Sequence, residues 1–184
     1  MKKICLLFTL VMAMPLLVFS QDAKFMGLDL GGSVDAFCKT LKTKGLKQTI
    51  DRFDKKEFVG TFATYNDCRI IVYATEVSKK VKMVEVVFES VKDDEYDRNK
   101  AFKEIVEQYK NKYKERVVRE PYDKSSEALG IDAYIVKCGD IEIDIRKMGP
   151  NFLIPNECSM YVTYKSKSLC ALKEVDENKF SNDI

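Results

Sequence analysis

Hydrophobic residues recur with a helical period in two parts of this chain. In the first part they follow the i, i+3, i+4, i+7 spacing of one helix face, over residues 34–41. Ser33 is a favourable N-cap residue, and Gly45 is typical of a position just past a helix end. We therefore expect a helix that begins after Ser33. Its apolar face consists of Val34, Phe37, Cys38 and Leu41.

The second helical period is longer and more polar. It predicts a helix over about residues 94–114, with lysines and glutamates of both signs on the outer face. Such a mixed surface is typical of a helix that packs one face on a sheet and exposes the other. Its apolar face consists of Phe102, Ile105, Val106, Tyr109 and Tyr113.

Between and after these helices, apolar and polar residues alternate, which indicates half-buried antiparallel strands. Turns are expected at Tyr65-Asn66-Asp67 and at Ser78-Lys79-Lys80, and a hairpin at Gly139-Asp140. Residues 123–130 and 148–155 are expected to be loops. The predicted strands are 46–53, 57–65, 69–75, 81–91, 116–122, 131–138, 140–146 and 158–165.

The order of these elements predicts an α+β fold. One helix precedes four strands, and the pattern then repeats, over approximately residues 25–91 and 92–184. Two such tandem units side by side would form an antiparallel sheet covered by helices on one face. Residues 21–184 are thus expected to form a single domain.

The first twenty residues read as a signal peptide. Lys2 and Lys3 precede an apolar run from Ile4 to Phe19, and cleavage is expected before Gln21. A membrane anchor is the rival interpretation, but the run is short for a span of about 20 residues. We expect an exported protein, periplasmic or extracellular, that keeps no stable membrane anchor after cleavage.

Charge and composition exclude several classes of function. The chain has 31 Lys+Arg, 29 Asp+Glu and no His, and the excess of two lies in Lys2 and Lys3. The rest of the chain has no net charge, and its lysines and acids are interleaved. It therefore has no positive electric field that would attract nucleic acid. Without His, the usual general base and the commonest metal ligand are missing. We therefore predict no catalytic, cofactor-binding or metal-binding residues and no cofactor.

Five cysteines remain after residue 20, with no Cys-x-x-Cys pair for zinc or redox chemistry. Cys38 is expected to be a small buried hydrophobic residue of the first helix. One disulfide is expected among the other four, and the sequence does not choose the pair. Those four are Cys68, Cys138, Cys158 and Cys170.

Three short motifs suggest chemistry, and each has a simpler structural interpretation that we favour. The segment Gly27–Ser33 resembles the phosphate-binding turn of sugar kinases of the actin-like fold, but a loop leading into a helix N-cap explains it too. Asp140, Glu142 and Asp144 can bind Ca²⁺ or act as an acid and base, whereas a solvated strand face also alternates in this way. A Ser–Lys dyad at Ser125-Ser126 or Ser166-Lys167-Ser168 has no supporting motif.

A set of short segments occurs in a fixed order along the chain: 25–27, 32–37 with Leu41, 44–46, 58–62, 81–88, 112–113, 141–145, 161–164 and 182–184. In this order they resemble a group of small exported proteins of Bacteroides-type bacteria, for which no activity is established. Where this group has Gly after the Lys-Tyr pair, this chain has Lys114, and Ser166 and Ser168 replace an Asp and an Asn. The resemblance implies paired helix-plus-sheet units, similar in outline to the β-lactamase-inhibitor-protein fold, and no site residues.

These observations favour a non-enzymatic binding module that acts through the exposed sheet face or the hairpin loops at Asn66 and Gly139. Its expected partner is another exported or envelope protein; the oligomeric state is left open. A first alternative is an inhibitor-like protein that acts on a secreted hydrolase, suggested by the fold analogy alone. A second is an enzyme that uses carboxylates or a thiol, with Asp140, Asp144 or Cys138 as the residues to substitute.

Overall fold

The computed structural model describes residues 23–91, 93–120, 130–149 and 158–172. The predicted signal peptide, the loop at 123–129 and Ser125-Ser126 lie outside the described residues. The elements are α2 (Val34–Thr43), β1 (Lys47–Asp51), β2 (Lys55–Phe62), β3 (Tyr65–Ala74), β4 (Val81–Phe88), η1 (Glu89–Val91), α3 (Glu95–Tyr113), η2 (Lys114–Arg116), β5 (Val117–Arg119), β6 (Ile131–Cys138), β7 (Ile141–Met148) and β8 (Ser159–Ser166).

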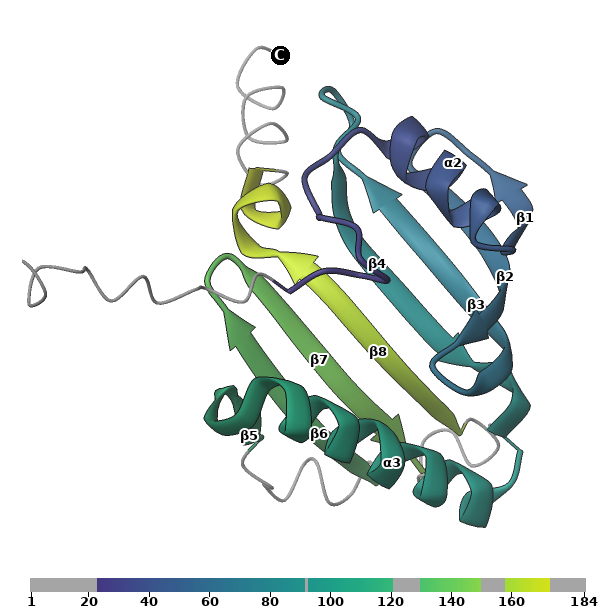
Figure 1. The fold of residues 1–184 in the computed structure, drawn as a ribbon, viewed down its shortest axis with the longest axis vertical. Coiled ribbons are helices and arrows are strands. Elements are labelled where there is room, and N and C mark those ends of the chain that lie inside the picture. Colours follow the sequence, from purple (N-terminus) through teal and green to yellow (C-terminus); the bar gives the residue numbers. More distant parts are fainter. Residues whose placement is uncertain (1–22, 92, 121–129, 150–157, 173–184) are drawn as a thin grey trace, which may run out of the picture.

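All eight strands form one antiparallel sheet, which confirms the α+β class. The strand order is β1-β2-β3-β4-β8-β7-β6-β5, so the last strand of the chain pairs with β4 in the middle of the sheet. The edges are β1 and β5. Both α2 and α3 lie on the same face, α2 over the first strands and α3 over β5 to β8 (Figure 1). The opposite face carries no helix in the described part of the chain.

Helix α2 forms where the apolar period predicts it. Its buried residues are the four expected, and Gly45 follows its end with φ +88°, a conformation that glycine adopts without a steric penalty. Ser33 occupies the N-cap position, but its side chain makes no capping hydrogen bond. The reason is that the loop before α2 pairs with the start of β4, where Ser33 bridges Lys80.

Helix α3 is capped by side-chain chemistry at its start and strained at its end. Asp94 accepts a hydrogen bond of 2.9 Å from the Asp97 backbone N–H. At the other end, Lys114 has φ +52° and ψ −125°. The lysine therefore holds a backbone conformation that suits glycine far better.

The predicted turn at Tyr65-Asn66-Asp67 is wrong by two residues. The chain turns at Ala63-Thr64, and β3 already begins at Tyr65. Asn66 and Asp67 lie in a β-bulge, where the register with β2 shifts and Asp67 has φ +55°. Turns and bulges favour the same residue types because both need left-handed backbone, which explains the error.

Other strand ends also differ from the prediction. β4 ends at Phe88 rather than at residue 91, because η1 follows it. Among the described residues of the predicted strand 116–122, β5 covers Val117–Arg119, and residues 121–122 lie outside the described ranges. β7 extends through Met148, which was expected to begin a loop. The chain after β8 is helical over residues 167–172, an element that the sequence did not predict.

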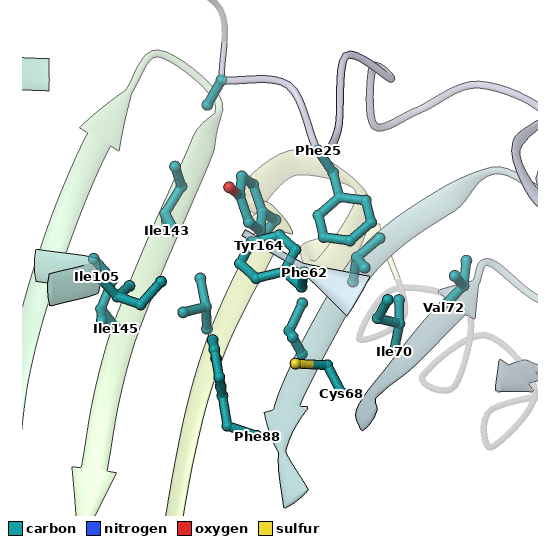
Figure 2. Packing of buried hydrophobic residues seen from close by; sticks show 14 of the residues in the cluster. Phe25, Phe62, Cys68, Ile70, Val72, Phe88, Ile105, Ile143, Ile145 and Tyr164 are labelled. Carbon is teal, nitrogen blue, oxygen red and sulfur yellow. The ribbon is translucent and has the colours of Figure 1, made fainter. Parts of the chain in front are cut away.

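The core lies between the sheet and the helices, and the segment before α2 helps to fill it. The Phe25 ring is fully buried, stacked on Phe62 at 5.6 Å between ring centroids and edge-on to Tyr164 at 5.3 Å. Figure 2 shows these rings together above the middle strands. The contact ties the N-terminal segment to β2 and β8, which belong to different halves of the chain.

Candidate functional site

The candidate site is the sheet face opposite α2 and α3, here called the open face. Because side chains alternate along each strand, the pairing register fixes which residues share this face. The middle of the face is a line of directly paired residues that crosses six strands. This central row consists of Glu57, Ile71, Glu85, Thr163, Asp144 and Ile135.

Cationic residues flank the central row on both sides. On one side the arginine row consists of Val59, Arg69, Val87, Tyr161, Arg146 and Ala133. On the other side the lysine row consists of Lys55, Tyr73, Met83, Lys165, Glu142 and Lys137. Three carboxylates in the centre are thus bordered by two arginines and three lysines.

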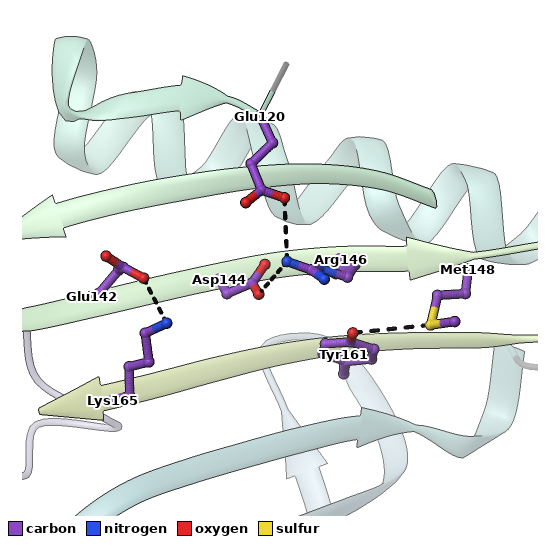
Figure 3. Close-up of polar contacts among 7 residues, drawn as sticks. All are labelled: Glu120, Glu142, Asp144, Arg146, Met148, Tyr161 and Lys165. Carbon is purple, nitrogen blue, oxygen red and sulfur yellow. Dashed lines mark hydrogen bonds and ion pairs between the residues drawn. The ribbon is translucent and has the colours of Figure 1, made fainter. Parts of the chain in front are cut away.

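Ion pairs connect the rows. Arg146 reaches Asp144 at 2.9 Å and Glu120 at 3.2 Å, between the nitrogen and a carboxylate oxygen of each (Figure 3). Lys165 pairs with Glu142 at 2.7 Å. These contacts neutralise much of the acidic charge within the open face itself.

A further ion pair lies within β2, at the other end of the central row. Lys55 Nζ lies 2.5 Å from Glu57, whose side chain is only 7% exposed. In β3, Arg69 pairs with Glu89 at 2.9 Å and keeps 40% of its side chain exposed. Arg69 is therefore the arginine of the open face that a partner reaches most easily.

Burial shifts the titration of two central carboxyls. Burial raises the pKa of Glu85, against the opposing effect of Arg69 and Lys55. Burial also raises the pKa of Asp144, with Arg146 acting in the opposite direction. Both groups are therefore held in an environment that disfavours their charged form.

The pair of Asp144 and Arg146 is not fully satisfied. Within the described part of the chain, Asp144 Oδ1 and Arg146 Nε are buried and have no hydrogen-bond partner. Buried polar atoms almost always have a partner in native proteins. This pair is the most polar and least satisfied point of the open face.

Between the charges, the open face carries half-buried aromatic and sulfur side chains. Tyr73, Met83, Val87 and Tyr161 are each partly exposed, and Ile71 is 3% exposed beneath them. Burial raises the pKa of Tyr161 and of Tyr73, so both are neutral phenols at neutral pH. Neutral tyrosines present a flat apolar ring with one hydroxyl at its tip.

The sequence-predicted carboxylates separate into two groups. Glu142 and Asp144 lie on the open face, with side chains 17% and 16% exposed. They are therefore largely shielded by their cationic neighbours, and the expectation of a solvated strand face is wrong for them. Asp140 lies apart from both, in the turn between β6 and β7.

Asp140 and the two serines of Ser166-Lys167-Ser168 form a structural cap. The Ser166 hydroxyl donates to Asp140 at 2.5 Å, and the Ser168 backbone N–H donates to it at 2.9 Å. These bonds lower the pKa of Asp140, the Ser166 bond most. Asp140 thus caps the helical residues 167–172, and the serines are engaged in that cap.

The glycine-containing segment before α2 uses its backbone within the fold. The Gly31 N–H donates to the Val81 carbonyl at 2.8 Å, and the Val81 N–H donates to Gly32 at 2.9 Å. The segment therefore docks onto the start of β4. This arrangement agrees with a loop that leads into the helix, and the kinase-like interpretation gains no support.

The five cysteines of the described ranges are free thiols in the structure, which therefore does not contain the expected disulfide. Cys38, Cys68 and Cys138 are buried, as predicted for Cys38. Burial raises the pKa of Cys38 and of Cys68 to about 11, which keeps both protonated at neutral pH. Neither thiol has the environment of a nucleophile.

Sequence reasoning missed most of the open face. Glu57, Glu85, Arg69 and Tyr161 were not singled out, because alternation places each on a face without saying which residues pair. The hairpin at Gly139 was a usable signal, since it sets the β6–β7 register. The pairing of β4 with β8 had no such signal.

Neither metal clusters nor membrane-spanning helices are found in the described ranges. No group of three or more Cys, Asp or Glu in the described ranges is placed to hold a metal ion. No helix among the described residues has the length and hydrophobicity to cross a membrane.

Comparison of the chain with protein-family models, curated proteins and solved structures found no match.

Proposed function

We propose that this protein is an exported, non-enzymatic binding module, built from two tandem helix-plus-four-strand units, whose open face binds another protein of the cell envelope or exterior. The observation that carries the proposal is the composition of that face. Tyrosine, methionine and arginine gather there around carboxylates that are already neutralised. Protein interfaces are enriched in the same three residue types.

The charge pattern favours a protein over other partners. Acids and bases lie in rows that are two residues apart along each strand, roughly 7 Å. Their electric fields therefore cancel at a distance and give no extended positive potential that would attract a polyanion. At contact distance the same pattern is specific, because a partner must match each sign in register. Only another folded surface with its own fixed charges offers that match.

An enzymatic role is less well supported. The open face has two carboxyls with raised pKa, Asp144 and Glu85, but Asp144 is paired with Arg146, and Arg69 and Lys55 act against the shift at Glu85. The Asp140 carboxyl belongs to a helix cap. The thiols of Cys38 and Cys68 are buried and protonated.

The alternative role as an inhibitor requires that the partner be a secreted hydrolase. The identity of the captured partner in the binding test decides this.

The test uses the mature protein as bait in an envelope extract, with two variants of equal charge change. Arg69→Ala removes the most exposed arginine of the open face, and Lys103→Ala removes an exposed cation from α3 on the other side of the sheet. We expect one partner to be captured by the wild type and by Lys103→Ala, and lost from Arg69→Ala.

Two results would overturn the proposal. Equal capture by the two variants would place binding elsewhere on the molecule, and the absence of a retained protein at every salt concentration would count against a binding module. Circular dichroism of both variants verifies that each is folded. Assays of any captured hydrolase with and without the protein then identify or remove the inhibitor role.

A further inference from the structure

A second feature lies on the covered side of the sheet, away from the open face. It is a cavity of about 260 Å³ above β8, where the segment before α2, the end of β2 and α3 converge. Gly27 and Ala63 stand at its edge and are exposed, so that small residues leave the cavity open to solvent. No group of the proposed binding surface lines it.

Aromatic rings form the buried walls of this cavity. Phe62, Tyr109 and Tyr164 all line it, and each is less than 10% exposed. Met26 adds a partly buried thioether side chain. Such walls suit an apolar or aromatic body of a ligand.

Two of these walls also supply a polar group. The hydroxyls of Tyr109 and Tyr164 are hydrogen-bonded to each other in the interior. Each phenol carries one proton, and the bond between them uses one of the two. The second proton is not used in this bond, so the pair keeps a polar group beside the apolar walls.

The rim of the cavity is positively charged. Lys24 and Lys112 both line it, and none of its described lining residues is acidic. Lys24 pairs with Asp29 at 3.0 Å, but that carboxylate is 64% exposed and outside the lining. Lys112 Nζ lies 5.0 Å from the centre of the Tyr113 ring. The rim therefore favours an anionic end of a ligand.

The backbone around the cavity is strained at two non-glycine positions. Met26 has φ +50° and Ala63 has φ +54°, and both residues line the cavity. Both are turn residues: Met26 lies in the turn that closes the Phe25–Leu28 bridge, and Ala63 lies in the turn between β2 and β3. Tight turns commonly use left-handed backbone, so these two turns shape the edge of the cavity.

We propose that this cavity binds a small organic acid, with its apolar body between the aromatic walls and its carboxylate toward Lys24 and Lys112. The volume falls just below the roughly 300–1,000 Å³ of pockets that hold drug-sized ligands, so the acid is small. The inference does not rest on the proposed function, because none of the residues that line the cavity belongs to the three rows of the open face.

The test measures binding of two acids and of their uncharged amides to the mature protein. The probes are octanoate and 3-phenylpropionate, and the controls are octanamide and 3-phenylpropanamide. We expect saturable binding of at least one acid, tighter than its amide, with NMR amide shifts concentrated at residues 24–27, 62–63 and 108–112. Lys112→Met is expected to weaken it roughly threefold or more, as for one lysine near the surface.

Lys103→Met is the matched control, since it removes one exposed lysine of the same helix that does not line the cavity. It should bind the acid as the wild type does. The proposal is overturned if neither acid binds at millimolar concentration, if amides bind as tightly as acids, or if the shifts map elsewhere. The wild-type comparison of acid with amide decides the matter even where a variant fails to fold.

Discussion

The two faces of the sheet use the same backbone for different purposes. On the covered face, Ile70, Val86, Val162 and Ile143 are fully buried beneath the helices and make an apolar core. The residues next to them along each strand point to the open face. Most of these neighbours are charged or polar, and the apolar ones form only a thin layer. The comparison shows that one face holds the fold together, while the other keeps partly buried polar groups at a cost to stability, which the proposed binding role would explain.

The largest expected difference comes from two neighbouring isoleucines. Ile70 and Ile71 are 0% and 3% exposed, on the covered and the open face respectively. Ile70→Ala should lower the free energy of unfolding by about 3–4 kcal/mol, because helices and sheet cannot close the cavity. Ile71→Ala should lower it by about 1–2 kcal/mol, since the long side chains above it can settle.

Chemical denaturation of both variants measures this difference. Equal losses would mean that the open face is packed as tightly as the core and is not a surface awaiting a partner.

Two tyrosines extend the comparison to hydrogen bonds. Tyr109→Phe leaves the Tyr164 hydroxyl buried without its partner, and should cost about 1–2 kcal/mol of unfolding free energy. Tyr161→Phe on the open face should change it by less than about 0.5 kcal/mol, because the hydroxyl of this partly exposed side chain keeps a 4.0 Å contact with Met148 sulfur and an interaction with Arg146, both of which water can replace. A larger loss for Tyr161→Phe in thermal unfolding would reverse the assignment of the two faces.

Helix α3, which covers part of the sheet, ends in a strained backbone conformation that a substitution can relieve. Lys114 ends α3 with φ +52°, whereas α2 is followed by Gly45 with φ +88°. Lys114→Gly should therefore raise the free energy of unfolding by about 1 kcal/mol. The converse variant, Gly45→Ala, should lower it by a similar amount. A loss of stability in Lys114→Gly would show that the lysine side chain holds the helix end by a contact worth more than the strain.

The smallest expected effect is a pH-dependent gain on the open face. The pKa of Glu85 in the folded protein is raised above its ordinary 4.5, so its ionised form opposes folding at neutral pH. Glu85→Gln should be more stable than the wild type at pH 7, by less than about 1 kcal/mol in this half-buried setting. The gain should shrink as the pH falls through the folded pKa toward 4.5 and vanish below it.

Denaturation at several pH values tests this prediction. A variant that is less stable than the wild type at pH 7 would show that the attraction of Arg69 and Lys55 to the charged carboxylate exceeds the cost of its burial.

Local pattern was sufficient for most elements of the fold. The period of residues 34–41 and of 94–114 located both helices, and alternation located the strands, because each signal depends on neighbours in sequence. It failed at Asn66-Asp67, where a bulge and a turn need the same left-handed backbone. It also missed the helical residues 167–172, since their cap is Asp140, 28 residues away from Ser168.

The open face was much harder to predict, for a physical reason. Its central row depends on Glu85 of β4 lying opposite Thr163 of β8, two residues separated by most of the second half of the chain. Glu57 and Asp144 are buried because these distant strands pair, and the local sequence pattern around each residue does not indicate that burial. Asp140, Glu142 and Asp144 formed a visible motif, yet only two of them belong to the surface.

The most direct test of the central claim is the affinity of the purified captured partner for Arg69→Ala relative to Lys103→Ala, measured by calorimetry on folded protein. The account predicts binding to Arg69→Ala that is at least about tenfold weaker, as for an arginine central to an interface. Equal affinities for the two variants would contradict it, because the open face would then contribute nothing to recognition.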